Sequence, residues 1–147
     1  MKIVTDVAEA VLAELNAGSF SEPFQAQRLY LPIHELAQLT ELKVMVVARG
    51  VDIARSSRED DELNVQVDIG LRQRVLPDNT QRIDELLALV EAIEGYLNRR
   101  ELAALPHAEW MGAISEPLYD PVDLRERHTF TAALSLTYRL VRQPHGS

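Results

Sequence analysis

The chain has 147 residues, 46% hydrophobic and 26% charged, which is enough for one domain with a single core and is typical of globular proteins. Its formal net charge of -8 at pH 7 argues against a nucleic-acid-binding surface, because such a surface needs clustered Lys and Arg. The chain has no cysteine, which excludes disulfide bonds and thiolate sites.

No targeting or membrane segment is predicted. The first 16 residues include Asp6, Glu9 and Glu14, which does not fit the apolar segment of a secretory signal. The longest apolar run, Val44 to Ala48, is far shorter than the roughly 20 residues that span a bilayer. We therefore expect a soluble protein of a reducing cytoplasm.

The first predicted element is an amphipathic helix that starts near Asp6 and stops at Gly18. Asp6 and Glu9 have the spacing of a capping box, and Gly18 suits a helix C-terminus. Apolar residues on one face stand at positions 4, 7, 8, 11 and 15. After a turn at 19–23, residues 24–31 predict an extended segment, and residues 33–39 predict one or two helical turns.

Two strands are predicted in the middle of the chain. Residues 42–48 are apolar on both faces, which predicts a central strand or one whose second face a neighbouring subunit covers. Arg49-Gly50 indicates a turn or a bulge, and residues 52–62 a polar extension or loop that joins two antiparallel strands. Residues 63–75 begin with strict alternation of apolar and polar side chains, the pattern of a strand buried on one face.

A second main helix is predicted over residues 80–99, after the break at Pro77. Its apolar positions at 83, 86, 90, 93 and 97 form one stripe, as expected for a helix that covers a sheet. The same spacing also suits pairing with a second helix. Ile83 and Val90 would then belong either to the core or to a dimer interface.

The last third of the chain predicts a strand at 109–116, a polar loop at 117–127 and a long alternating strand at 130–140. The sequence as a whole predicts an α+β fold, with a mostly antiparallel sheet and two main helices packed on one face. We expect a single domain over residues 1–142 and a flexible C-terminal tail over residues 143–147.

No group of residues predicts catalysis, a metal site or a cofactor site. The spacing of the histidines does not match a metal motif, and solvated loop residues are the better interpretation of His34, His107, His128 and His145.

A hydrolase or transferase could use His128 or the Asp120/Asp123 pair, but no base, nucleophile and oxyanion donor can be assembled around them. The neighbouring Arg125 and Arg127 favour a salt-bridged surface instead. Trp110, the single tryptophan, is predicted to serve in packing or as an interface anchor.

The densest charge pattern runs from Arg55 to Glu62. It fits a solvated loop, a polar arm whose basic and acidic halves pair with a neighbouring copy, or a catalytic serine, although the segment holds no His or Lys base. The second interpretation names a set of candidate subunit contacts. These residues are Arg55, Arg58, Glu59, Asp60 and Asp61.

The order of these elements resembles that of the tail terminator (tail completion) proteins of long-tailed bacteriophages and prophages. The resemblance covers most of the chain and lies in spacing, not in a chemical signature. The segments that carry it are 15–16, 24–32, 35–36, 42–47, 57–58, 64–69, 83–86 and 130–139.

The resemblance implies an α+β structural protein with no enzymatic activity and no cofactor. Six copies would form a ring that caps the tail tube and joins it to the head. The implied partners are other copies, the tail tube protein and a head-completion or stopper protein, with no membrane. DNA would pass through without specific binding, as the acidic charge favours, and the protein would belong to the virion tail or neck after assembly in the host cytoplasm. The alternatives are a head-completion or stopper protein and a small non-enzymatic dimeric binding module.

Overall fold

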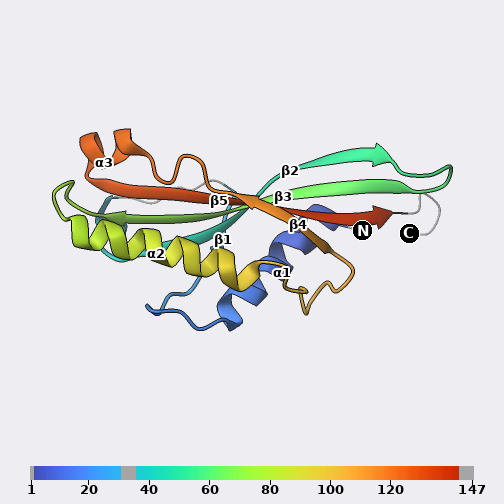
Figure 1. Cartoon of the computed structure of the whole chain (residues 1–147), viewed down its shortest axis with the longest axis horizontal. Coiled ribbons are helices and arrows are strands. Elements are labelled where there is room, and N and C mark those ends of the chain that lie inside the picture. Colours follow the sequence, from blue (N-terminus) through green and yellow to red (C-terminus); the bar gives the residue numbers. More distant parts are fainter. Residues whose placement is uncertain (1, 31–35, 143–147) are drawn as a thin grey trace.

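The computed structural model describes residues 2–30 and 36–142, which form one five-stranded sheet in the order β1-β2-β3-β5-β4 (Figure 1). All neighbouring strands are antiparallel except β1 and β2. The predicted α+β class with a mostly antiparallel sheet is therefore confirmed. The strands are β1 (Gln27–Arg28), β2 (Lys43–Arg55), β3 (Asp61–Arg74), β4 (Glu109–Ile114) and β5 (Thr129–Arg142).

The helices are α1 (Ile3–Ala17), α2 (Thr80–Leu97) and α3 (Pro121–Arg127), with a 3-10 helix η1 (Leu36–Thr40). The prediction that Asp6 caps α1 was wrong. The helix starts three residues earlier, because Ile3 is already buried in the core, and Asp6 lies in the first turn, where a carboxylate is favoured by the helix dipole. Gly18 ends α1 as predicted.

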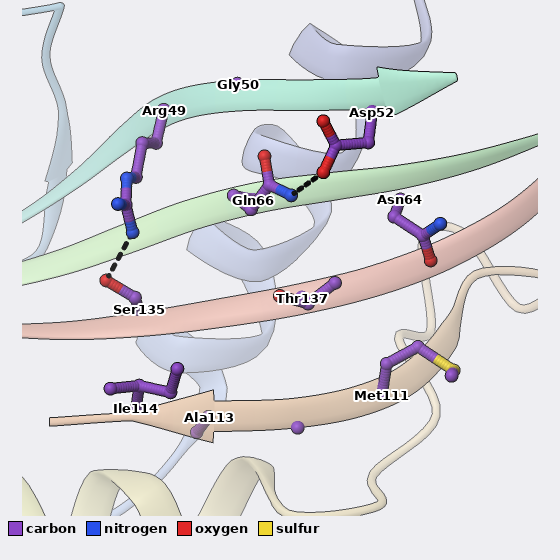
Figure 2. A pocket seen from close by; sticks show the side chains of 11 residues that line it. Arg49, Gly50, Asp52, Asn64, Gln66, Met111, Ala113, Ile114, Ser135 and Thr137 are labelled. Atoms are coloured by element: carbon purple, nitrogen blue, oxygen red, sulfur yellow. Dashed lines mark hydrogen bonds between the residues drawn. The ribbon is translucent and has the colours of Figure 1, made fainter. Parts of the chain in front are cut away.

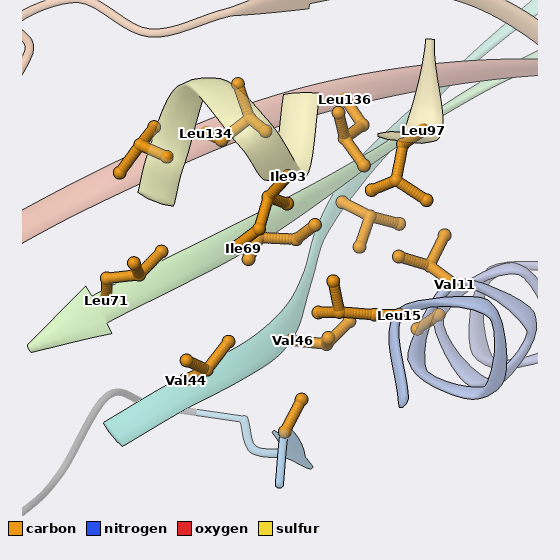
Figure 3. Packing of buried hydrophobic residues seen from close by; sticks show 14 of the residues in the cluster. Val11, Leu15, Val44, Val46, Ile69, Leu71, Ile93, Leu97, Leu134 and Leu136 are labelled. Atoms are coloured by element: carbon orange, nitrogen blue, oxygen red, sulfur yellow. The ribbon is translucent and has the colours of Figure 1, made fainter. Parts of the chain in front are cut away.

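The main core lies between α1, α2 and one face of the sheet. The alternating side chains of β3 that were predicted to be buried are buried, and those of β5 lie beside them in the same cluster. Figure 3 shows Val11 and Leu15 of α1 and Ile93 and Leu97 of α2 pointing into this cluster. Ile83 and Val90 are also buried there, so the stripe of α2 packs within its own chain.

The apolar strand at 42–48 became part of β2, and the chain itself accounts for its two-faced burial. Val44 and Val46 belong to the main core, whereas Met45, also buried, lies beside Gly70 on the other face. A side chain at position 70 would crowd Met45, since a Cβ there would lie 3.1 Å from Met45 Cγ. η1 lies against β3, and its Leu39 is fully buried.

Three segments differ most from the predictions. Strand β2 continues to Arg55, so the connection to β3 is only residues 56–60. Only two residues of the extended segment 24–31 form a strand. The predicted loop at 117–127 contains helix α3, because Asp120 Oδ1 accepts hydrogen bonds from the N–H groups of Val122 and Asp123 (2.9 and 3.1 Å) and Pro121 suits the first turn. The predicted tail at 143–147 and part of the predicted turns at 33–39 lie outside the described residues.

Candidate interaction surface

The face of the sheet opposite α1 and α2 carries a groove of about 810 Å³ (Figure 2). It crosses β2, β3, β5 and β4, and most of its lining side chains are polar or small. Along β3 and β5, the lining residues alternate with the buried residues. Gln66, for example, lies between the buried Val65 and Val67. The period-2 pattern that builds the core therefore also builds this polar face.

Two β-bulges lie in the walls of the groove. One falls between Ala48 and Gly50 of β2, and the other between Trp110 and Gly112 of β4. A bulge bends its strand and increases the local twist, so the sheet curves at both sides of the groove. Gly112 has φ = 154°, a conformation that residues with a side chain rarely adopt.

Hydrogen bonds between strands hold the polar side chains of the groove in place. Ser135 Oγ donates to Asp68 Oδ1 (2.7 Å) and accepts from Arg49 Nη1 (3.2 Å), and Gln66 Nε2 donates to Asp52 Oδ2 (3.2 Å) (Figure 2). Because each charge here already has a partner, the face is suited to recognition by shape and hydrogen bonding.

Beyond the groove, Arg139 joins three strands. Its guanidinium donates to Glu109 of β4 (2.7 Å) and to Glu62 of β3 (3.2 Å). The hydrogen bond and the negative charge of Glu109 raise the pKa of Arg139, with a smaller effect from Glu62. Arg139 thus remains charged and links the short strand β4 to the middle of the sheet.

The predicted contact residues Arg55, Arg58, Glu59, Asp60 and Asp61 lie together at the end of the β2–β3 hairpin, which projects beyond the helices (Figure 1). Arg58 and Glu59 are exposed at the tip. Asp61 instead belongs to β3 and accepts a hydrogen bond from Arg142 Nη2 (3.1 Å). The tip is held by Ser57, whose Oγ accepts from the Asp60 N–H (3.1 Å) and whose carbonyl accepts from Arg55 Nε (3.2 Å).

The residues that could have suggested catalysis have structural roles. Asp120 caps α3, and Asp123 forms an ion pair with Arg127, as the neighbouring arginines had predicted. His128 ends the same helix in the left-handed conformation. Trp110 packs edge-on against the ring of Tyr138, with centroids 5.9 Å apart, so its packing role is confirmed.

Sequence inspection missed Arg82, which connects helix α2 to the loop after α1 and to strand β3. Its guanidinium donates to Glu22 (2.7 and 2.8 Å), to Gln73 (2.7 and 3.0 Å) and to Glu85 (3.4 Å). The hydrogen bond to Glu22 is the main cause of the raised pKa of Arg82, while partial burial acts in the opposite sense. Sequence inspection also missed the groove, for which the isolated glycines at 50 and 112 were the available signal, because glycine within a strand often marks a bulge.

Within residues 2–30 and 36–142 there is no group of three or more side chains that could hold a metal ion. Nor does any helix of that part have the length and apolar character needed to cross a membrane. His107 and His128 are exposed, and His34 and His145 lie outside the described residues. No family model and no curated protein matches the chain.

Proposed function

We propose that this chain is a structural assembly protein of the tail terminator type, which acts through contacts with copies of itself. The observation that carries the proposal is the β2–β3 hairpin, which extends past the helices and exposes Arg58 and Glu59 at its end (Figure 1). Residues 52–59 at its end are all exposed. It can reach a neighbouring subunit.

The resemblance supplies the rest of the proposal. Six copies form a ring that closes the tail tube, contacts the tube protein on one side and meets a head-completion or stopper protein on the other. The protein belongs to the tail or neck of the virion and is made in the host cytoplasm, where it works without a membrane, a cofactor or enzymatic turnover. A net charge of -8 favours a channel through which DNA slides without being retained.

A head-completion or stopper protein remains the alternative within the same class. The arrangement of α2 weighs against a dimer mediated by that helix. Its apolar stripe, including Ile83 and Val90, is buried against the sheet of the same chain, so no apolar helix face of that kind is available to a partner.

Electron microscopy of the purified chain, alone and mixed with tail tubes from the same phage genome, tests the proposal. We expect rings, either free at high concentration or only at the ends of tubes. Light scattering of the same samples measures the mass of the assembly. A chain that remains monomeric and leaves tube ends bare would contradict the terminator function, whereas rings that bind the head connector but not the tube would support the stopper alternative.

A further inference from the structure

Among residues 2–30 and 36–142, the sheet has an unpaired outer edge on each side. β4 is the last strand on one side. On the other side, β1 pairs only with Met45 and Val46 of β2, and the Leu29 N–H adds one hydrogen bond to the Val46 carbonyl (3.0 Å). Within the described residues, no strand pairs with the outer edge of β2 from 47 to 55. Such an edge presents backbone groups that can pair with another strand.

The two edges lie at the same height in the sheet and run in opposite directions. β4 lies opposite residues 135–139 of β5, which lie opposite 64–68 of β3, and these lie opposite 47–52 of β2. Each of these three steps is antiparallel, so β4 and β2 are antiparallel to each other. A second copy displaced sideways along the sheet would therefore place its β4 next to the free part of β2.

The edge strand β4 exposes large apolar side chains, and the free stretch of β2 exposes one beside the charged Arg49, Asp52 and Arg55. Met111 and Ile114 of β4 are 47% and 67% exposed, and Ile53 of β2 is 56% exposed. β4 contains neither lysine nor proline, and its only charged residue is Glu109. Lysine, proline and β-bulges are common means by which natural edge strands avoid pairing, and β4 has the bulge near Gly112 but neither lysine nor proline.

We propose that β4 of one copy pairs antiparallel with residues 47–55 of β2 in the next copy, which gives a head-to-tail contact between identical subunits. The proposal rests on the self-assembly put forward above and identifies the surface involved. A second copy fits better than another partner because the same sheet has both edges, at the same height and with antiparallel directions. An unrelated strand would pair with only one of the two edges. Contacts of this heterologous kind close into a ring when the rotation between copies divides a full turn.

Disulfide trapping tests the contact directly, since the chain has no cysteine of its own. Glu109→Cys protomers are mixed with Asp52→Cys or with Ala54→Cys protomers under mild oxidation. All three positions are on the uncovered face, and position 109 is level with 52. A disulfide forms only where two Cα atoms approach to roughly 4.4–6.8 Å. We expect a disulfide-linked dimer of unlike protomers in at least one mixture, and none when Glu109→Cys meets Leu76→Cys, an exposed control in the loop after β3.

A matched pair of charge variants tests the same contact without oxidation. Ala54 and Ala133 are both exposed and point to the same face of the sheet, but Ala54 lies on the free edge and Ala133 on the inner strand β5. We expect Ala54→Lys to abolish the oligomer at concentrations where the parent chain assembles, and Ala133→Lys to preserve it. Thermal melts followed by circular dichroism confirm that both variants fold.

The outcomes separate this proposal from the proposed function. Two results would overturn the pairing of edges and leave self-assembly in place. In the first, oligomers form but neither the 109–52 nor the 109–54 cross-link appears. In the second, Ala133→Lys abolishes the oligomer and Ala54→Lys does not. A chain that is monomeric at every concentration and on tube ends, and forms no specific cross-link, would overturn both.

Discussion

At the scale of single residues, Gly18 is tightly surrounded by side chains and Gly95 is not. A Cβ at Gly18 would lie 2.9 Å from the rings of both Phe20 and Tyr96, whereas a Cβ at Gly95 would meet nothing within 4 Å. The two rings pack edge-on with centroids 5.3 Å apart, and the Tyr96 hydroxyl donates to the Glu14 carbonyl (3.0 Å). The absence of a side chain at Gly18 therefore lets α1, α2 and the following turn come together.

Gly18→Ala is expected to lower the free energy of unfolding by about 1–3 kcal/mol, because the aromatic rings must shift to admit a methyl group. Gly95→Ala is expected to raise it by about 0.5–1 kcal/mol, because alanine is a better helix former and the site is open. Urea denaturation of both variants measures the difference. A stabilising effect at position 18 would show that the aromatic contact does not exclude a side chain.

Tyr138 combines a fully buried ring with a hydroxyl that finds no hydrogen-bond partner within the described residues. Burial, with a smaller contribution from the charge of Glu14, raises the pKa of Tyr138 above its usual value. In the unfolded chain the phenol ionises near pH 10. The stability that depends on the neutral phenol is therefore present below about pH 10 and is lost as the pH rises further, because the unfolded state then releases the proton more readily.

Tyr138→Phe is expected to be as stable as the parent chain or more stable by about 1 kcal/mol at pH 7, since it removes a buried hydroxyl without a partner. Above about pH 10 its advantage should grow, because one group that ionises on unfolding is gone. Urea denaturation between pH 7 and pH 11 measures this, with Tyr30→Phe as an exposed control. An advantage that stays constant with pH would contradict the linkage.

At the scale of elements, β5 is the strand on which the others depend. It pairs with β3 over its whole length and carries β4 on its other side. Its inward side chains are all buried. These residues are Phe130, Ala132, Leu134, Leu136, Tyr138 and Leu140.

Truncation after Pro106 is expected to unfold the chain. Each of the large side chains lost with β5 contributes roughly 1.5–3 kcal/mol when buried, so their loss is comparable to the whole net stability of an ordinary domain, about 5–15 kcal/mol. Far-ultraviolet circular dichroism and a thermal melt provide the measurement. A cooperative transition in the truncated chain would mean that residues 2–106 have a core of their own.

At the scale of the whole molecule, the charged tip of the β2–β3 hairpin is the feature that the fold itself does not use. Arg55 and Asp61 are engaged within the chain, while Arg58 and Glu59 point to solvent. If the tip reaches a neighbouring subunit, its charge affects association and leaves the stability of the protomer unchanged.

Arg58→Glu is expected to weaken self-association, and the effect should diminish with added salt because exposed charges are screened. Arg99→Glu, an equal charge reversal at an exposed position after α2, is the matched control and should leave assembly unchanged. Sedimentation or light scattering across a concentration series gives the measurement. An oligomer that is unaffected by Arg58→Glu would remove the tip from the interface.

Local periodicity by itself determined the main elements of this protein. The alternation at 63–71 and 130–140 predicted two strands that are buried on one face, and the stripe from Ile83 to Leu97 predicted α2, because these patterns depend only on neighbours in the chain. The same residues placed the core and the mostly antiparallel sheet. The Arg49-Gly50 pair also indicated the bulge in β2.

Only the tertiary structure decided where elements begin and which surfaces remain free. Helix α1 starts before its capping signal, where Ile3 is buried, and Arg82 of α2 connects Glu22 and Gln73 from two separate segments. The groove likewise requires two bulges from strands about 60 residues apart in the chain. These features arise from pairing between distant residues. A linear pattern does not contain that information, because the strand order and register determine which side chains meet.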